Sequence, residues 1–294
     1  MTDVLLKATV PGVKAFAAST TRLVDEARRR HDCYPIATAA LGRVMTGALL
    51  MAANLKNEES LTIRVSGNGP IGEIVADADN KGIVRGYVHN PQIHLPAKNG
   101  KLDVGGAVGG GHIYVTRFTG LKEPFTGSTE LVSGEIAEDI AQYLLLSEQT
   151  PATIMLGVKV QPDLTASAAG GLLVQAMPGA EDDILAKVES NLEQLPSITE
   201  MMEAGLDAGG MIAAAFSGLP VTYGEPEPLV FRCRCSQERV ERMLMSLGRQ
   251  ELASLVLEKR AEIKCHFCSQ MYEFNQGELE NLLQELPDSE KASQ

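Results

Sequence analysis

The pattern of apolar and polar positions predicts an α+β domain over residues 1–180. Residues 36–54 are apolar on nearly every side and rich in Ala and Gly, so this segment is expected to be a central, closely packed helix. Alternation of apolar and polar residues is typical of half-buried strands. It occurs at residues 61–66, 74–76, 84–88 and 112–118, and residues 154–160 and 166–175 indicate a hairpin.

Capping residues mark the starts of two further helices in this domain. Thr20 or Thr21 can cap a helix that ends near His31, and Ser133 can cap a helix that ends near Leu146. Such side chains accept a hydrogen bond from a free backbone N–H in the first helical turn. Together with the strands, these helices give a mixed core of sheet and helix.

Three glycine-containing motifs resemble ligand-binding loops, and the residues around each argue against that interpretation. Residues 67–72 match the dinucleotide fingerprint Gly-x-Gly-x-x-Gly, but a strand follows where the fingerprint needs a helix. Residues 77–88 begin like a calcium loop and lack the bidentate glutamate at their end. Residues 105–111 lack the Lys-Ser/Thr of a phosphate loop. We expect two hairpin turns and a flexible loop.

Residues 181–218 predict a run of short amphipathic helices. Apolar residues lie on one face and acidic residues on the other, and Pro196 and the pair Gly209-Gly210 interrupt the run. Helices this short must dock on another surface to be stable, and methionines make the apolar faces adaptable. The apolar positions include Ile184, Leu185, Val188, Leu192, Met201, Met202, Met211 and Phe216. Residues 218–228 contain three prolines and are expected to connect this segment to the last part of the chain.

Charge separates the same segment from the rest of the chain. The formal net charge is −12, and residues 181–230 hold ten acidic residues and one basic residue. We therefore expect a core domain of residues 1–180, a metastable acidic helical linker of residues 181–230 and a C-terminal domain of residues 231–294. The negative charge argues against nucleic acid as a partner, because phosphates are best bound by segregated basic patches.

The first residues of the chain and its cysteines lead us to expect a cytoplasmic protein. Its first residues lack the layout of a signal peptide. Residues 35–55 are the most apolar long segment, but Arg43 and Thr46 interrupt them, so a buried helix is expected and no membrane partner. Cytosolic thiols are kept reduced, and clustered cysteines there favour metal or redox chemistry over structural disulfides.

Four of the five cysteines form two close pairs near the C-terminus. Cys233 and Cys235 are separated by one residue, and after 29 further residues Cys265 and Cys268 are separated by two. Two close pairs joined by a foldable spacer can place four thiolates around one tetrahedral Zn²⁺. We therefore predict that these four residues bind one zinc ion in the reduced protein. His266 lies inside the second pair as a spacer, and we discount it as a ligand.

A four-cysteine zinc site can be structural or can act as a redox switch. Structural sites are the commoner kind, but zinc-bound thiolates are already deprotonated and are ready for oxidation once exposed. Each pair can also close a local disulfide when the metal leaves. A Cys265–Cys268 bridge forms readily, whereas a Cys233–Cys235 ring is small and strained and should be easily reduced again. The fifth cysteine, Cys33, is expected to be a buried apolar residue rather than a nucleophile.

The cysteine pattern resembles that of the redox-regulated 33 kDa heat-shock chaperone family, the 33 kDa chaperonins. The resemblance extends over essentially the whole chain. It is carried by the Cys-x-Cys and Cys-x-x-Cys pairs and by residues 29–43, 66–78, 146–151, 169–171 and 177–179.

The resemblance implies a molecular chaperone of the holdase type and not an enzyme. It implies that the reduced, zinc-bound form is inactive, and that oxidation forms Cys233–Cys235 and Cys265–Cys268 disulfides and releases zinc. The C-terminal domain and the linker would then unfold, and the protein would dimerise and bind unfolding client proteins. The core domain would serve client binding and dimerisation, and the apolar linker residues between Ile184 and Phe216 are candidates for contacts with clients.

Two other classes of function fit parts of the pattern. A zinc-ribbon module that binds nucleic acid or protein would need a basic or aromatic surface near the metal, and residues 231–294 hold eleven acidic and nine basic residues. A thiol oxidoreductase would use Cys265 and Cys268, but its Cys-x-x-Cys motif normally opens a helix after a strand. Here the motif lies in a predicted hairpin.

Overall fold

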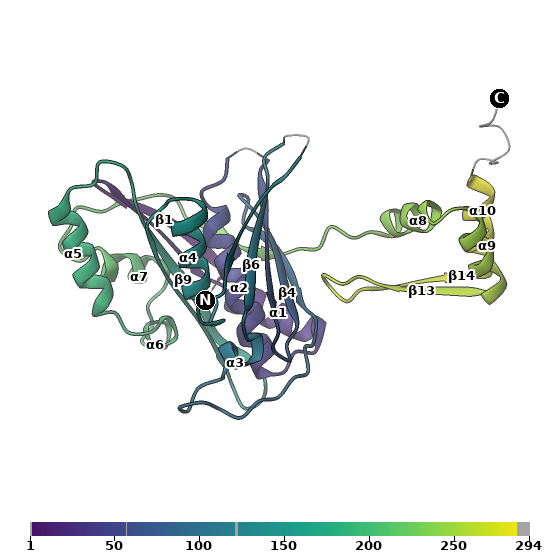
Figure 1. Cartoon of the computed structure of the whole chain (residues 1–294), viewed down its shortest axis with the longest axis horizontal. Coiled ribbons are helices and arrows are strands. Elements are labelled where there is room, and N and C mark those ends of the chain that lie inside the picture. Colours follow the sequence, from purple (N-terminus) through teal and green to yellow (C-terminus); the bar gives the residue numbers. More distant parts are fainter. Residues whose placement is uncertain (1, 57, 121–122, 287–294) are drawn as a thin grey trace. The chain divides into compact units, whose positions relative to one another are not determined.

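The computed structural model describes residues 2–56, 58–120 and 123–286 (Figure 1). The chain divides into two compact units, of which the first ends at Arg232 and the second begins at Cys233. Residues 181–230 belong to the first unit in this division.

The first unit contains two sheets, and most of the predicted strands occur in them. Sheet A has the order β10-β1-β2-β9-β8 with β11 also paired to β1, and sheet B has the order β12-β5-β4-β3-β6-β7. The long strands are β1 (Val4–Val10), β2 (Val13–Ser19), β3 (Ser60–Gly67), β4 (Glu73–Asp79), β5 (Ile83–Val88), β6 (Gly111–Phe118), β7 (Phe125–Glu130), β8 (Ala152–Val160) and β9 (Ala166–Ala176). The mixture of sheets and helices confirms the predicted α+β class.

Helix α2 (Pro35–Ala52) is the central element of the first unit. It packs against strands of both sheets and lies in the main hydrophobic cluster. By length and composition alone it could cross a membrane, but 89% of it is buried inside the protein, as predicted for a core helix. Gly47 allows close packing, because a Cβ atom there would lie 2.4 Å from Cδ1 of Ile140.

Helix α1 (Thr21–His31) is capped by a residue distant in sequence. The prediction that Thr20 or Thr21 would cap it is wrong, because Thr20 occupies the N-cap position without a side-chain hydrogen bond. Asp3 instead accepts hydrogen bonds from the backbone N–H groups of Arg22 and Leu23, at 3.1 and 2.6 Å. The carboxylate thus satisfies the free donors of the first turn.

Helix α4 (Ala137–Ser147) is also capped by an unexpected residue. Ser133 lies four residues before this helix, so the prediction that it caps α4 is wrong. The buried carboxylate of Asp139 accepts hydrogen bonds from the backbone N–H groups of Val132, Ser133, Gly134 and Ile136. These bonds hold Ile136 at a φ of 76°, a region that β-branched residues rarely adopt.

The glycine-containing motifs have structural roles. Residues 67–72 turn the chain from β3 into β4, and residues 79–83 turn it from β4 into β5, so both are hairpin turns as predicted. Residues 105–111 are not a simple loop, because helix α3 (Val104–Val108) occupies their first part, capped by Asp103. A Cβ atom on Gly67 would lie 2.0 Å from the carbonyl oxygen of Val108. Close backbone approach to α3 therefore requires that glycine.

Residues 181–218 form the predicted short helices, which cover sheet A. They are α5 (Asp182–Glu193), α6 (Ile198–Glu203) and α7 (Ala208–Ala215). Neighbouring residues of β2 alternate between two clusters: Phe16 packs in the cluster with α2, and Ala15 and Ala17 pack in the cluster with α5, α6 and α7. The three helices therefore lie on the face of sheet A opposite α2 (Figure 1).

The connector that follows α7 joins both sheets. Its strands are β10 (Thr222–Tyr223) and β11 (Glu227–Pro228), which pair with β1, and β12 (Val230–Phe231), which pairs in parallel with β5. An ion pair of 2.8 Å between Lys7 and Glu227 and a hydrogen bond of 3.0 Å from Arg232 N to Val84 O support this path. We call residues 222–232 the strap.

The second unit is small. It contains α8 (Gln237–Ser246), α9 (Arg249–Glu258), β13 (Arg260–Lys264), β14 (Met271–Asn275) and α10 (Gln276–Glu285). Ser236 caps α8, and Asn275 and Glu278 form a reciprocal capping box at α10. Its buried core consists of Val240, Leu244, Leu252, Ala261, Phe274, Leu279 and Leu282.

Replacement of Asp139 by alanine should destabilise the first unit. Four backbone N–H groups would lose their acceptor, and two of them, those of Gly134 and Ile136, belong to buried residues. The loss should lower the free energy of unfolding by about 2–5 kcal/mol. Urea denaturation of the reduced protein, followed by circular dichroism, measures this loss. Glu138→Ala is the control, because Glu138 precedes Asp139 and is exposed. Equal stability of the two variants would contradict the assigned role of Asp139.

Candidate metal centre

An irregular segment and a tight turn present the four clustered cysteines. Cys233 and Cys235 lie in the segment just before α8, and Cys265 and Cys268 lie in the turn between β13 and β14, as predicted. Backbone hydrogen bonds from Ser269 N to Cys265 O (2.8 Å) and from Cys265 N to Gln270 O (2.9 Å) close this turn. Ser269 adopts a φ of 57°, which folds the chain back into β14.

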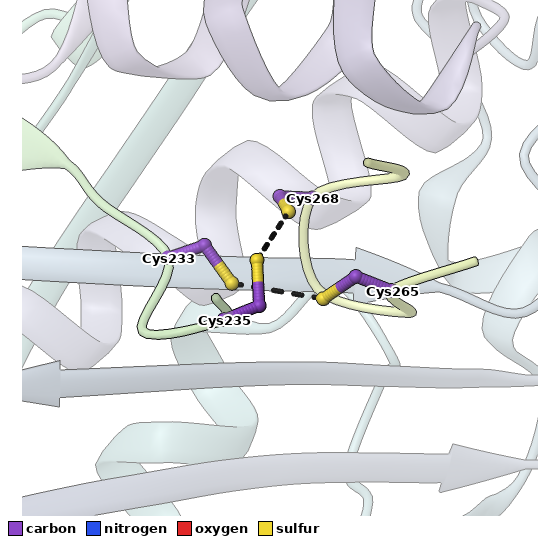
Figure 2. Close-up of side chains that lie close together, drawn as sticks. All are labelled: Cys233, Cys235, Cys265 and Cys268. Atoms are coloured by element: carbon purple, nitrogen blue, oxygen red, sulfur yellow. Dashed lines mark hydrogen bonds between the residues drawn. The ribbon is translucent and has the colours of Figure 1, made fainter. Parts of the chain in front are cut away.

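The four sulfur atoms converge on one small volume (Figure 2). All four lie within 4.8 Å of one another, with Sγ–Sγ distances of 3.7 Å for Cys233–Cys265 and 3.4 Å for Cys235–Cys268. A tetrahedral Zn²⁺ with bonds of about 2.3 Å holds its sulfur ligands about 3.8 Å apart. Disulfide sulfurs lie only about 2.05 Å apart, so these are free thiols in an arrangement that fits a metal ion.

The thiols cannot all ionise together without a cation. Burial disfavours the Cys233 thiolate, but hydrogen bonds from the Cys235 backbone N–H and from the neighbouring thiols outweigh it and lower the pKa of Cys233 to about 7. Burial raises the pKa of Cys265 and that of Cys268, and for Cys268 hydrogen bonds to the other cysteines raise it further. One thiolate therefore forms first, and additional negative charges at such short range need a positive ion between them.

Tyr272 is a neighbour of the site that sequence reasoning missed. Its hydroxyl interacts with Cys235, and this hydrogen bond and the burial of the phenol raise the pKa of Tyr272. Groups that hydrogen-bond to metal ligands orient them and tune their basicity. The only sequence signal was a hydroxyl-bearing aromatic residue on the strand that leaves the cysteine turn.

Other candidate residues lie apart from the sulfur cluster. Within the described ranges, the four cysteines form the only group of three or more side chains placed to share a metal ion, and His266 is not among them. Cys33 is 1% exposed, and burial together with the nearby Asp32 raises its pKa to about 12. Cys33 is therefore a buried, unreactive thiol, as predicted.

The apolar residues of 181–218 are covered in this structure. Those that are buried against sheet A are Val188, Met201, Met202, Met211 and Phe216, and those that are partly buried are Ile184, Leu185 and Leu192. A role in binding clients would require these helices to move from sheet A.

Comparison with known proteins identifies the family. A family model described as "Hsp33 protein" matches residues 3–275. The chain belongs to the Hsp33 family. A 33 kDa chaperonin of Desulforamulus reducens is 48% identical over 294 residues, which cover 99% of this chain and 100% of the relative. A 33 kDa chaperonin of Bacillus subtilis is 45% identical over 92% of this chain and 94% of its own length.

A solved Hsp33 structure has the same fold. The crystal structure of the 33 kDa chaperonin from Thermotoga maritima matches with a TM-score of 0.89 and 35% sequence identity. The match covers 96% of this chain and 98% of the other. This Hsp33 protein is therefore a heat-shock chaperone by family, with four cysteines positioned for a metal ion.

Substitution of a single clustered cysteine should abolish metal binding. The reduced wild-type protein is expected to hold about one zinc ion per chain, and Cys268→Ser should lose most of it because three thiolates leave the tetrahedron open. Atomic absorption after removal of free metal measures the ratio. Cys33→Ser is the matched control and should keep its zinc. Full zinc content in Cys268→Ser would refute the four-thiolate site.

Proposed function

We propose that this Hsp33 protein is a redox-regulated holdase that protects unfolding and oxidatively damaged client proteins from aggregation in the cytoplasm. In the reduced state one Zn²⁺ would be bound by Cys233, Cys235, Cys265 and Cys268, and the chaperone would be inactive. Oxidation would release the zinc and start the conversion to the active form. The observation that carries the proposal is the convergence of four free thiols from two close pairs.

Zinc is proposed to act as a cross-link within the second unit. The buried core of this unit is small, and the cysteines do not belong to it. The segment with Cys233 and Cys235 forms no helix or strand, and its sulfurs contact those of the β13–β14 turn. Zinc in a structural site of this kind contributes roughly 10 kcal/mol of folding free energy. Loss of the metal should therefore unfold much of the unit.

Peroxide or hypochlorite is the proposed oxidant. With peroxide, one thiolate attacks a peroxide oxygen to give a sulfenic acid and hydroxide, and a second thiolate displaces another hydroxide to form the disulfide. Each bridge thus transfers two electrons to one peroxide molecule, and two bridges consume all four zinc ligands.

The proposed bridges are Cys233–Cys235 and Cys265–Cys268. In the folded unit, the sulfur contacts of 3.7 and 3.4 Å instead join the two pairs to each other. Once the metal has left and the unit has unfolded, short loops close at lower entropic cost than long loops, which favours bridges within each pair.

The linker is proposed to respond because its helices depend on docking. Helices α5, α6 and α7 have 12, 6 and 8 residues and are too short to persist alone. Their release would expose the apolar residues of the linker and also those of the sheet A face beneath them, such as Val13 and Leu172. Both surfaces are candidates for client binding and for the proposed dimerisation of the oxidised form. The acidic excess of residues 181–230 would keep the opened protein soluble.

The strap is proposed to connect unfolding of the second unit with release of the linker helices α5, α6 and α7. Its three strands have two residues each, and the last ordered pairing before Cys233 is the hydrogen bond from Arg232 N to Val84 O. If the second unit unfolds, the end of the strap is followed by a disordered chain. Its hydrogen bonds to β5 should then open more easily. Loss of pairing that spreads back to β10 would also free the chain that follows α7, because β10 holds this chain to β1.

Chaperone activity should depend on oxidation. In an aggregation assay with a thermally unfolding client, the reduced, zinc-loaded protein is expected to protect weakly, and the peroxide-treated protein is expected to protect strongly as zinc is released. The Cys33→Ser variant should behave like the wild type, since Cys33 is not a zinc ligand. Equal protection by the reduced and oxidised forms would refute the switch.

Weakening the docking of the linker should activate the chaperone without oxidation. Met211 is fully buried against sheet A, and Met211→Gln would cost about 2–5 kcal/mol of docking free energy. The reduced variant should suppress aggregation while it retains its zinc. Met243→Gln is the matched control, because Met243 is 46% exposed and lies in the second unit. An inactive Met211→Gln variant with an undocked linker would argue against client binding by these surfaces.

A further inference from the structure

An open groove lies between α4 and α5 at the β8 edge of sheet A. Its volume is about 520 Å³. Its floor includes Thr153 and Val174 on the same face of sheet A that α5, α6 and α7 cover elsewhere. The three linker helices therefore leave one strip of this face uncovered in the folded protein. We call this site the α4–α5 groove.

Two helical faces of matching pattern form the walls. Helix α4 contributes Glu138, Ala141, Gln142 and Leu145, and helix α5 contributes Leu185, Val188, Glu189 and Leu192. Both sets have the spacing i, i+3, i+4, i+7, which places all four residues on one side of a helix. Each wall thus presents apolar side chains and one glutamate toward the groove.

The apolar surface of the groove is accessible in the folded protein. Leu145 is 53% exposed, and Val132, another lining residue, is 56% exposed. Large exposed apolar residues that gather at one hollow indicate an interaction site more strongly than scattered ones. The groove also continues into the apolar cluster beneath the linker through Val13, Val174 and Val188.

Charge indicates what the groove binds. The described residues that line it include two acidic ones, Glu138 and Glu189, and no Lys or Arg. A bound segment with Lys or Arg beside its apolar residues would neutralise these carboxylates, whereas acidic neighbours would be repelled. We propose that the α4–α5 groove binds short apolar segments flanked by basic residues, and that it does so in the reduced, folded protein.

This site would give the resting chaperone a first, weak contact with a client before oxidation. The proposal takes the class of partner from the proposed chaperone function. It needs neither zinc release nor movement of the linker, because the groove is open while α5 is docked. Absence of peptide binding in the groove would therefore not contradict the proposed redox switch. Absence of the redox switch would not contradict peptide binding in the groove.

Binding of a labelled peptide to the reduced, zinc-loaded full chain tests the proposal. The probe is a short fluorescent peptide with Leu and Phe in its middle and Lys at both ends, and the comparison peptide has Glu in place of Lys. Fluorescence anisotropy should show binding of the Lys peptide that weakens with added salt. It should show much weaker binding of the Glu peptide.

Neighbouring leucines on α4 provide a matched pair of variants. Leu145 lines the groove, whereas Leu146 is 62% exposed and does not line it. Leu145→Gln should raise the Kd of the Lys peptide about five-fold, because about half of a leucine side chain remains to be buried on binding. Leu146→Gln should leave the Kd unchanged. The double variant Glu138→Gln, Glu189→Gln should remove most of the preference for Lys over Glu.

Three results would overturn the proposal. The first is no binding of the Lys peptide to the reduced protein, and the second is an equal loss of binding in Leu145→Gln and Leu146→Gln. The third is a resting dimer that dissociates in Leu145→Gln and not in Leu146→Gln without any peptide. That outcome, seen by analytical ultracentrifugation, would assign the groove to a second copy of this chain.

Discussion

The repulsion that would arise among four closely spaced thiolates is the constraint on which the proposed switch depends. The sulfurs of Cys233, Cys235, Cys265 and Cys268 lie within 4.8 Å of one another. Hydrogen bonds lower the pKa of Cys233 to about 7, whereas burial raises the pKa of Cys265 and that of Cys268. A divalent cation changes this balance, because it favours ionisation of every ligand at once and joins the two cysteine pairs. The second unit has few buried apolar residues. In the proposed switch its fold would therefore depend on a bound metal, and metal binding would depend on the redox state of the four cysteines.

The first unit is built differently, because short helices that the proposed switch would release lie beside a core that does not include them. Helix α2 is buried between two sheets, and none of the residues of α5, α6 and α7 belongs to its hydrophobic cluster. The opposite face of sheet A is covered mainly by α5, α6 and α7, which are short helices held by side-chain burial. The strap then links that cover to the start of the second unit through pairings of two residues each. The three strands of two residues, β10, β11 and β12, thus lie between the linker helices and the four cysteines along the chain.

Sequence patterns predicted the elements whose signals are local. The cysteine pairs, the apolar helix α2, the β8–β9 hairpin and the amphipathic linker helices all have a period or spacing that is visible within a short window. The caps of α1 and α4 were predicted wrongly, because Asp3 reaches a helix that starts eighteen residues later and Asp139 binds the turn that precedes its own helix. The strands of the strap were missed, since two residues are too few to show alternation and their partners lie far away in the sequence.

Hydrogen exchange on the whole chain, before and after peroxide treatment, tests the central claim most directly. The claim is that loss of the metal centre releases the linker from sheet A. Amides of α5, α6 and α7 should be protected in the reduced protein and should lose protection once zinc has left, while amides of α2 stay protected. Unchanged protection of α5, α6 and α7 in fully oxidised, zinc-free protein would contradict the account.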